Sequence, residues 1–225
     1  MQLYSWPVSF ITLKNAIFSA LLAVLVCVHA QAFDLDLNIL KQIQERFGEA
    51  ASNRILNWQR IVRDNQNLGE IEKLELINRF FNQITFISDE QHWQREDYWA
   101  TPLEMLATNG ADCEDYSIAK YFTLRELGIA DEQLKITYVK ALRLNQAHMV
   151  LAYYPYPGAE PLILDNLIND ILPASERPDL APVYSFNGEG LWLSKLSSQE
   201  GKRIGEASKL KNWQDNMTRH NRLFK

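Results

Sequence analysis

The sequence predicts an α+β domain in which helices come first and an antiparallel sheet follows. Two patterns indicate this fold class. Apolar residues recur at helical spacing up to Gly128, and after it apolar and polar residues alternate in short segments, as along half-buried strands. The composition fits a packed core, because 47% of the 225 residues are hydrophobic and 11% are aromatic. No repeat or low-complexity linker divides the chain, so we expect one such domain.

Four helices are expected before the sheet. The spacing of apolar residues places them at about 37–47, 52–65, 69–83 and 113–128. Gly48 and Gly128 end the first and the last of these helices, as glycine commonly does just beyond a helix. Between the third and the fourth helix, the segment from Ser88 to Leu106 is rich in aromatic and acidic residues and is predicted to be a loop. We expect these helices to form an N-terminal lobe.

The second half of the chain is expected to form the sheet. Alternation predicts strands at 134–139, 147–154, 161–164, 184–186 and 191–193. The turn signal of Pro155–Gly158 makes the second and third of these strands an antiparallel hairpin. A polar helix from Ile204 to about Arg219 follows the last strand. The helical lobe is therefore expected to pack on a C-terminal antiparallel sheet.

Charge and cysteine content exclude several classes of function. The formal net charge is -5 and the isoelectric point is about 5.4, with no dense basic cluster. Such a chain is a poor candidate for binding nucleic acid or an anionic membrane surface. Only two cysteines are present, which excludes a small disulfide scaffold.

The first 32 residues have the pattern of a secretory signal peptide. Lys14 precedes a compact apolar run over 16–28, and Ala30-Gln31-Ala32 matches a small-x-small cleavage site. Cleavage there gives a mature domain of residues 33–225 that is exported and no longer inserted in a membrane. An uncleaved membrane anchor is the alternative.

Three residues are candidates for catalysis. Loss of the signal peptide removes Cys27 and leaves Cys113 as the single cysteine, which is either a nucleophile or an inert buried thiol. Cys113 lies at a predicted helix start, His148 opens one predicted strand and Asp165 ends the next. A cysteine, a histidine that takes its proton and an aspartate that orients the imidazole form a thiol-nucleophile triad. We therefore propose Cys113, His148 and Asp165 as this triad.

Hairpin geometry supports the triad. In an antiparallel pair the partners' residue numbers add up to a constant, and His148 faces Asp165 directly if the turn is centred within Pro155–Gly158. A different turn length or a bulge moves this pairing. The alternatives are an ordinary half-buried role for His148, a turn-capping role for Asp165, and His92 or His220 as the base.

Acidic residues crowd the candidate nucleophile. Asp112, Glu114 and Asp115 flank Cys113, and nearby negative charge raises a cysteine pKa above its usual value of about 8.5. A bound hard cation offsets this effect, and carboxylates are ligands that calcium prefers. Acidic residues are also common in the first turn of any helix. The spacing leaves both interpretations open.

Four segments resemble those of one protein family. They are Gly110-Ala111-Asp112-Cys113-Glu114-Asp115-Tyr116, Asp97-Tyr98-Trp99-Ala100-Thr101-Pro102, Ala147-His148-Met149-Val150-Leu151 and Leu164-Asp165-Asn166. This ordered set resembles the bacterial transglutaminase-like cysteine proteinases over nearly the whole mature chain. The resemblance implies a papain-like, transglutaminase-type fold with the triad named above, and a calcium site formed by Asp112, Glu114 and Asp115.

The resemblance also implies a function, that of a calcium-dependent periplasmic cysteine endopeptidase. Such a protease cuts the N-terminal region of a large surface adhesin, which releases the adhesin and disperses biofilm. It is inhibited when it binds the periplasmic domain of an inner-membrane receptor that senses cyclic di-GMP. Two other classes stay open: a transglutaminase, which passes the acyl group to an amine, and a non-catalytic periplasmic binding module.

Overall fold

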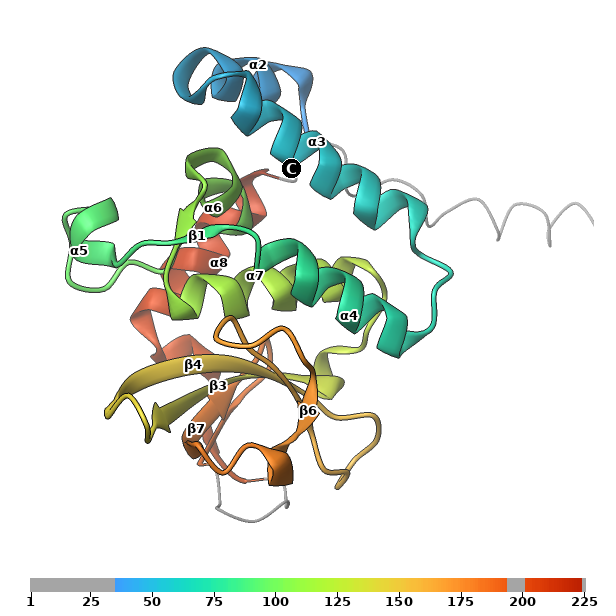
Figure 1. Cartoon of the computed structure of the whole chain (residues 1–225), viewed down its shortest axis with the longest axis vertical. Coiled ribbons are helices and arrows are strands. Elements are labelled where there is room, and N and C mark those ends of the chain that lie inside the picture. Colours follow the sequence, from blue (N-terminus) through green and yellow to red (C-terminus); the bar gives the residue numbers. More distant parts are fainter. Residues whose placement is uncertain (1–34, 194–200, 224–225) are drawn as a thin grey trace, which may run out of the picture. The chain divides into compact units, whose positions relative to one another are not determined.

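A computed structural model describes residues 35–193 and 201–223, within one compact unit that begins at Leu35 (Figure 1). The predicted signal peptide and its cleavage site lie outside the described residues. In the described part of the chain, no helix is long and apolar enough to cross a membrane. The helical lobe precedes an antiparallel sheet, which confirms the predicted α+β class.

Four of the observed helices match the four predicted before the sheet, and the structure has further helices besides these. The α-helices are α2 (Leu37–Phe47), α3 (Glu49–Asp64), α4 (Glu70–Phe81), α5 (Asp89–His92), α6 (Pro102–Thr108), α7 (Cys113–Glu126) and α8 (Lys211–Leu223). Asp36 caps α2, because its side chain accepts a hydrogen bond from the amide of Asn38 at 2.9 Å. Gly48 ends this helix at a φ of 85°, a left-handed conformation that favours glycine.

The predicted loop from Ser88 to Leu106 is wrong in part, because it contains α5 and most of α6. A capping box starts α6: Thr101 Oγ1 accepts from the amide of Glu104 at 3.3 Å, and Glu104 Oε2 accepts from the amide of Thr101 at 2.7 Å. Pro102 takes the first helical position, where its missing N–H is not needed. The density of aromatic and acidic residues conceals this start signal.

Seven strands form the main sheet in the order β6-β5-β4-β3-β7-β8-β9, and every neighbouring pair is antiparallel. The strands are β3 (Leu134–Ala141), β4 (Gln146–Tyr153), β5 (Leu162–Leu164), β6 (Leu172–Pro173), β7 (Leu180–Phe186), β8 (Leu191–Leu193) and β9 (Lys202–Gly205). A separate parallel pair joins β1 (Thr85–Phe86) to β2 (Gly110–Ala111). Short 3-10 helices cover Asp131–Gln133, Ala174–Glu176 and Ala207–Lys209.

The C-terminal helix begins later than predicted. Ile204 belongs to β9, which pairs with β8, and α8 starts only at Lys211. Both segments are polar, and β9 is largely exposed at the edge of the sheet, so hydropathy does not separate strand from helix here. Trp213 anchors α8 by stacking on Phe122 of α7, with ring centroids 5.5 Å apart.

Helix α7 lies at the centre of the domain. It contacts β3 and β4 on one side and α4 and α6 on the other (Figure 1). Its residues from Glu114 to Leu124 are all buried, polar ones included, because the helix is covered on every side. This packing places the N-terminus of α7, and with it Cys113, against strand β4.

Candidate active site

Cys113 takes the first position of α7, directly after the N-cap residue Asp112. Strand β2 leads into this turn, and its pairing with β1 fixes the chain just before the cysteine. The side chain is partly exposed, and its thiol donates a hydrogen bond to Oε2 of Glu114 at 3.1 Å. Unpaired amides and the dipole at a helix N-terminus favour an anion, so the position suits a nucleophilic thiolate.

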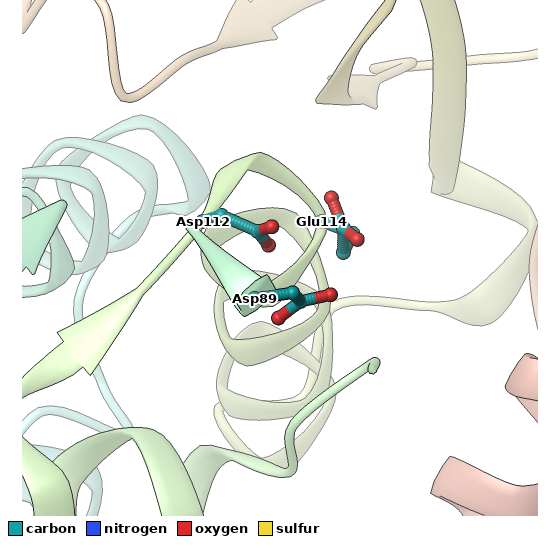
Figure 2. A group of neighbouring side chains, drawn as sticks. All are labelled: Asp89, Asp112 and Glu114. Carbon is teal, nitrogen blue, oxygen red and sulfur yellow. The ribbon is translucent and has the colours of Figure 1, made fainter. Parts of the chain in front are cut away.

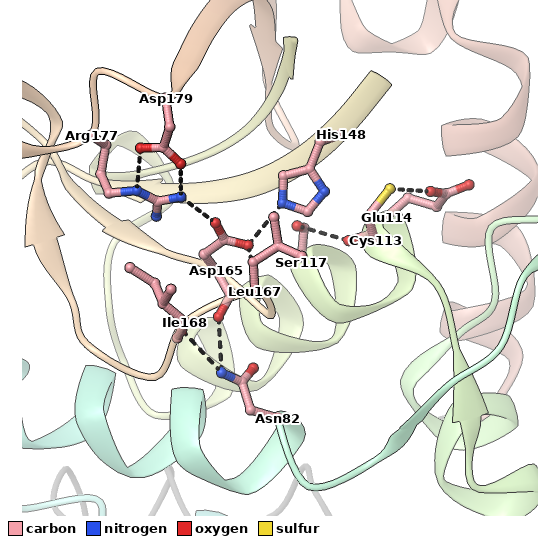
Figure 3. A network of polar contacts seen from close by, with 10 residues as sticks. All are labelled: Asn82, Cys113, Glu114, Ser117, His148, Asp165, Leu167, Ile168, Arg177 and Asp179. Atoms are coloured by element: carbon pink, nitrogen blue, oxygen red, sulfur yellow. Dashed lines mark hydrogen bonds and ion pairs between the residues drawn. The ribbon is translucent and has the colours of Figure 1, made fainter. Parts of the chain in front are cut away.

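His148 lies between Cys113 and Asp165 (Figure 3). Its Nε2 is 2.8 Å from Oδ1 of Asp165, and both side chains are buried. The other ring nitrogen points towards the sulfur of Cys113. The structure therefore brings the three predicted residues together in the order of a thiol, a base and an orienting carboxylate.

The predicted direct pairing of His148 with Asp165 is wrong by two residues. Leu151 pairs with Leu164 in the β4–β5 hairpin, and this register places Asp165 opposite Val150. Side chains alternate between the two faces of a sheet, so a shift of two residues leaves His148 and Asp165 on the same face. The imidazole then reaches the carboxylate diagonally, across a separation that long side chains can span.

Several donors hold Asp165. Its Oδ1 also accepts from the amide of Leu167 at 3.0 Å, and its Oδ2 accepts from Nη2 of Arg177 at 2.7 Å. Burial alone raises the pKa of Asp165, but the hydrogen bonds and charge of His148, Leu167 and Arg177 outweigh burial and lower the pKa to about 2. Asn82 fixes the backbone here by donating to the Asp165 carbonyl at 2.9 Å (Figure 3). The carboxylate is thus ionised at neutral pH and can orient the imidazole.

The other two histidines of the described residues are bound elsewhere. Nε2 of His92, in α5, lies 2.9 Å from Oγ1 of Thr108. His220, in α8, is buried and stacks on Phe122 with ring centroids 3.8 Å apart. The geometry therefore favours His148 as the base.

Three carboxylates converge near the N-terminus of α7, where Cys113 lies, and Figure 2 shows the three side chains. Asp89 of α5, Asp112 and Glu114 each offer an oxygen, and these atoms lie within 4.8 Å of one another. Two of the predicted metal ligands, Asp112 and Glu114, are therefore together, and Asp89 joins them. The third predicted ligand, Asp115, lies outside this group. Its oxygens instead accept hydrogen bonds from the amide of Ala100 at 2.6 Å and from that of Asp112 at 3.4 Å.

Burial and mutual repulsion disfavour the ionised form of these carboxylates. Burial and the charges of Glu114, Asp115 and Asp89 raise the pKa of Asp112 to about 10. The pKa values of Glu114, Asp115 and Asp89 are also raised, each chiefly by burial. In the described part of the chain, no Lys or Arg forms an ion pair with Asp89, Asp112 or Glu114. The group is therefore short of positive charge.

The same surroundings act on the thiol. Burial, the charge and hydrogen bond of Glu114, and the charge of Asp112 raise the pKa of Cys113. A hydrogen bond from the backbone amide of Met149, next to His148 on β4, works in the opposite direction. Without a cation among the acids, the thiolate is strongly disfavoured.

A hard divalent cation fits this group. Oδ1 of Asp89 and Oδ1 of Asp112 are buried, and no donor among the described residues bonds to either atom. Buried carboxylate oxygens without partners are unfavourable, and oxygen-rich clusters are the surroundings that calcium prefers. Asp89, Asp112 and Glu114 are thus the side chains that suit calcium as ligands.

Two residues of the site escape prediction from sequence. Asp89 lies in the segment predicted as a loop, far from Asp112 along the chain, and only the parallel pairing of β1 with β2 brings the two segments together. Arg177 follows a 3-10 helix in a segment whose apolar residues show no regular spacing, and its side chain bonds to Asp165 through a tertiary contact. Neither residue carries a local sequence signal.

Fold and site define a cysteine protease with an α+β, transglutaminase-type domain. The chain belongs to the bacterial transglutaminase-like cysteine proteinase family, BTLCP, whose model matches residues 50–180. The matched segment contains every residue of the site described above, from Asp89 to Arg177.

Solved structures of Legionella pneumophila LapG are similar to this chain. One is 42% identical with a TM-score of 0.70, over 80% of this chain and 97% of LapG, and an EGTA-treated form gives the same values. A calcium-bound form is 41% identical, again with a TM-score of 0.70, over 82% of this chain and 99% of LapG. No curated protein sequence matches the chain. The family model and the likeness to LapG together make the protein a cysteine protease of the LapG type.

Proposed function

We propose that this protein is a calcium-dependent cysteine endopeptidase with Cys113 as nucleophile, His148 as general base and acid, and Asp165 as the carboxylate that orients His148. One observation carries the proposal: His148 is hydrogen-bonded to Asp165 through one ring nitrogen and directs the other at the sulfur of Cys113. This is the arrangement that activates a thiol by an adjacent base.

The chemistry follows from these three side chains. The sulfur of Cys113 attacks the carbonyl carbon of the scissile peptide bond while its proton passes to His148. His148 gives that proton to the leaving amine as the C–N bond breaks, and the acyl group remains on Cys113 as a thioester. Water then attacks the thioester, His148 takes the proton from the water, and the C–S bond breaks to restore the thiol. Asp165 stabilises the imidazolium in both stages.

Calcium is proposed to bind Asp89, Asp112 and Glu114. When bound, it supplies positive charge that offsets these carboxylates. Glu114 is the link to catalysis, because it accepts the hydrogen bond of the Cys113 thiol and raises the pKa of that thiol. A carboxylate neutralised by a cation opposes the thiolate less, so His148 removes the thiol proton more readily. The similarity to a calcium-bound form of LapG supports this assignment.

The substrate, partner and location are also proposals. The likeness to LapG over most of the chain supports a substrate that is the N-terminal region of a large surface adhesin, whose release disperses biofilm. The same likeness supports inhibition by the periplasmic domain of an inner-membrane receptor that senses cyclic di-GMP. The secretory pattern of residues 1–32 supports action in the periplasm.

Incubation of the purified protein with an adhesin N-terminal fragment tests the proposed function. We expect cleavage in calcium, cleavage at least about tenfold slower in excess chelator, and recovery when calcium is returned. Cys113→Ser and His148→Ala should each abolish cleavage while circular dichroism shows an intact fold. Incorporation of a labelled amine in place of peptide cleavage would identify a transglutaminase instead. A substrate that is neither cleaved nor joined to the labelled amine would indicate a non-catalytic binding module.

A further inference from the structure

Arg177 and Asp179 form a charged pair next to Asp165. Neither residue belongs to the triad that was predicted from sequence. Arg177 and Asp179 follow the 3-10 helix Ala174–Glu176, and Arg177 is only 4% exposed. Nη2 of Arg177 donates to Oδ2 of Asp165 at 2.7 Å and to Oδ2 of Asp179 at 2.9 Å, and Nε donates to Oδ1 of Asp179 at 3.1 Å (Figure 3). The guanidinium thus lies between two carboxylates.

Arg177 completes the fixation of Asp165. One oxygen of Asp165 is occupied by His148 and the amide of Leu167, and the other is occupied by Arg177. Rotation of the carboxylate about the Cβ–Cγ bond therefore breaks hydrogen bonds at both of its oxygens. A planar guanidinium held by two hydrogen bonds to Asp179 has little freedom of its own. The orientation of Asp165 towards His148 thus depends on a residue that does not touch His148.

The support of this pair continues into the sheet. The backbone carbonyl of Asp179 accepts a hydrogen bond from the amide of Leu142 at 2.8 Å. Leu142 begins the turn between β3 and β4, and β4 carries His148 a few residues later. The segment with Arg177 and the strand with His148 are therefore joined independently of Asp165, which keeps the distance between base and orienting carboxylate constant.

We propose that Arg177 is a positioning residue of the protease, acting on His148 through Asp165, with Asp179 as the support that orients Arg177. This inference rests on the proposed function. Arg177 does two things: it fixes the direction of the Asp165 carboxylate, and it places a permanent positive charge beside that carboxylate, which favours the ionised form.

Among the charged groups that face Asp165, Arg177 is the cation that stays charged at every pH of interest. His148 faces Asp165 from β4, Arg177 and then Asp179 from the segment after the 3-10 helix, and Lys120 from α7. Lys120 is fully buried, and burial lowers its pKa to about 7 in spite of the charge of Asp165. Lys120 therefore loses charge near neutral pH, whereas an arginine stays charged. When Arg177 is replaced, Asp165 loses one of the interactions that lower its pKa, while those of His148 and Leu167 remain, so the pKa rises from its low value.

The test compares Arg177→Gln and Arg177→Lys with Arg63→Gln as a matched control. Arg63 is an exposed arginine of α3 beside Asp64, far from the triad in sequence and on another element. We expect Arg177→Gln to lower kcat/KM by about 10- to 100-fold near neutral pH, the range for residues that orient a functional side chain. The loss should grow as the pH falls towards about 4, because Asp165 with less stabilisation of its ionised form protonates nearer the usual pKa of an aspartate. Arg63→Gln should match the wild type at every pH.

Arg177→Lys separates charge from geometry. It keeps a cation beside Asp165 but cannot form the two parallel bonds to Asp179, so kcat/KM should fall while the acid limb of the pH profile stays in place. If Arg177→Gln fails to fold, as judged by its melting curve, the Arg177→Lys result decides. Wild-type kcat/KM in folded Arg177→Lys, or a loss in folded Arg177→Gln that is equal at all pH values, overturns the proposal.

A second readout keeps this inference separate from the proposed function. Alkylation of Cys113 by iodoacetamide in calcium needs no protein substrate and reports how well His148 assists the thiol. If the wild type cleaves no adhesin fragment but alkylates rapidly, and Arg177→Gln alkylates at least about 10-fold more slowly, then the substrate assignment fails and the role of Arg177 stands. Equal alkylation rates in the wild type and Arg177→Gln at all pH values contradict the role of Arg177.

Discussion

Two carboxylate sites lie close to Cys113 and His148, and the charges that surround them are opposite in sign. Asp165 has a donor on each oxygen and a buried arginine beside it, and its pKa is lowered to about 2. Burial and the charges of other acids among the described residues raise the pKa of Asp112 to about 10. The first site has all the partners it needs within the chain, whereas the second has buried oxygens that no described donor satisfies. The protein thus supplies a cation at Asp165 from its own chain, whereas at Asp112 it offers buried oxygens that suit the calcium ion we propose.

The largest effect is expected at Asp165, the carboxylate whose two oxygens both have donors within the chain. Asp165→Asn keeps the shape of the side chain but removes the charge that steadies the His148 imidazolium. We expect kcat to fall by about 10,000-fold, as when the orienting aspartate of a serine-protease triad is replaced. Steady-state cleavage assays at saturating calcium measure this loss, and activity within about tenfold of the wild type would show that Asp165 is not the orienting residue.

Removal of calcium should come next in size. Excess chelator leaves no cation beside Cys113, and burial together with Glu114 then raises the pKa of the thiol. Since each unit of pKa changes the thiolate fraction about tenfold, we expect cleavage to fall by at least about tenfold. Magnesium should restore little activity, because it demands tight octahedral coordination. Full rescue by magnesium would point to simple charge screening instead of a calcium site.

Melting temperatures should separate the two sites by sign. Asp112→Asn removes repulsion among buried acids, so in chelator it should raise the melting temperature, by about 2–4 °C for each kcal/mol gained. In calcium the same change should lower the melting temperature, because a ligand is lost. Asp165→Asn should lower it in both conditions, since Arg177 then keeps only Asp179 as a charged acceptor and His148 loses its own. An equal shift for Asp112→Asn with and without calcium would contradict the assignment of this residue as a ligand.

Asp89 and Asp115 sharpen the same comparison with a smaller effect. Asp89→Asn should behave like Asp112→Asn and weaken calcium binding in a titration calorimeter. Asp115→Asn should instead destabilise the fold by about 1–3 kcal/mol with or without calcium, because it weakens the bonds to the amides of Ala100 and Asp112. Loss of calcium affinity in Asp115→Asn and its retention in Asp89→Asn would restore the ligand set predicted from sequence.

The smallest effect is the pH dependence of stability. The raised pKa of Asp112 means that the folded state binds more protons than the unfolded state, so in chelator stability falls as the pH rises above about 4. Asp165 has the opposite sign: its stabilisation is present above about pH 4 and is lost as the pH falls towards 2. The gain in melting temperature from calcium should therefore grow between about pH 5 and about pH 8. A gain that shrinks with rising pH would contradict the raised pKa values.

Local patterns predict much of the fold. Apolar spacing finds α2, α3, α4 and α7, and alternation finds β3, β4, β5, β7 and β8. The misses have physical causes. The turn after β4 is compatible with more than one position of its centre, so the sequence leaves the β4–β5 register uncertain by two residues. A polar edge strand such as β9 has no alternating pattern of apolar residues.

The site is predictable only where its residues are marked by motifs. Cys113 begins α7, His148 lies near the start of β4 and Asp165 directly follows β5, and the family motifs surround all three. Asp115 is adjacent to the other acids along the chain, but the helix turns its side chain back to the amides before α7. Asp89 and Arg177 reach the site through tertiary contacts, and no spacing rule predicts those.

The central claim is that a calcium ion among Asp89, Asp112 and Glu114 enables the Cys113 thiolate to form. The rate of Cys113 alkylation by iodoacetamide, measured against free calcium at neutral pH, tests it most directly. The rate should rise with calcium to a plateau at least about tenfold higher, with the same midpoint as the calcium-dependent rise in melting temperature. Asp112→Asn should move both midpoints to higher calcium together. An alkylation rate that does not change with calcium, while the melting temperature rises, would show that the ion stabilises the fold without activating the thiol.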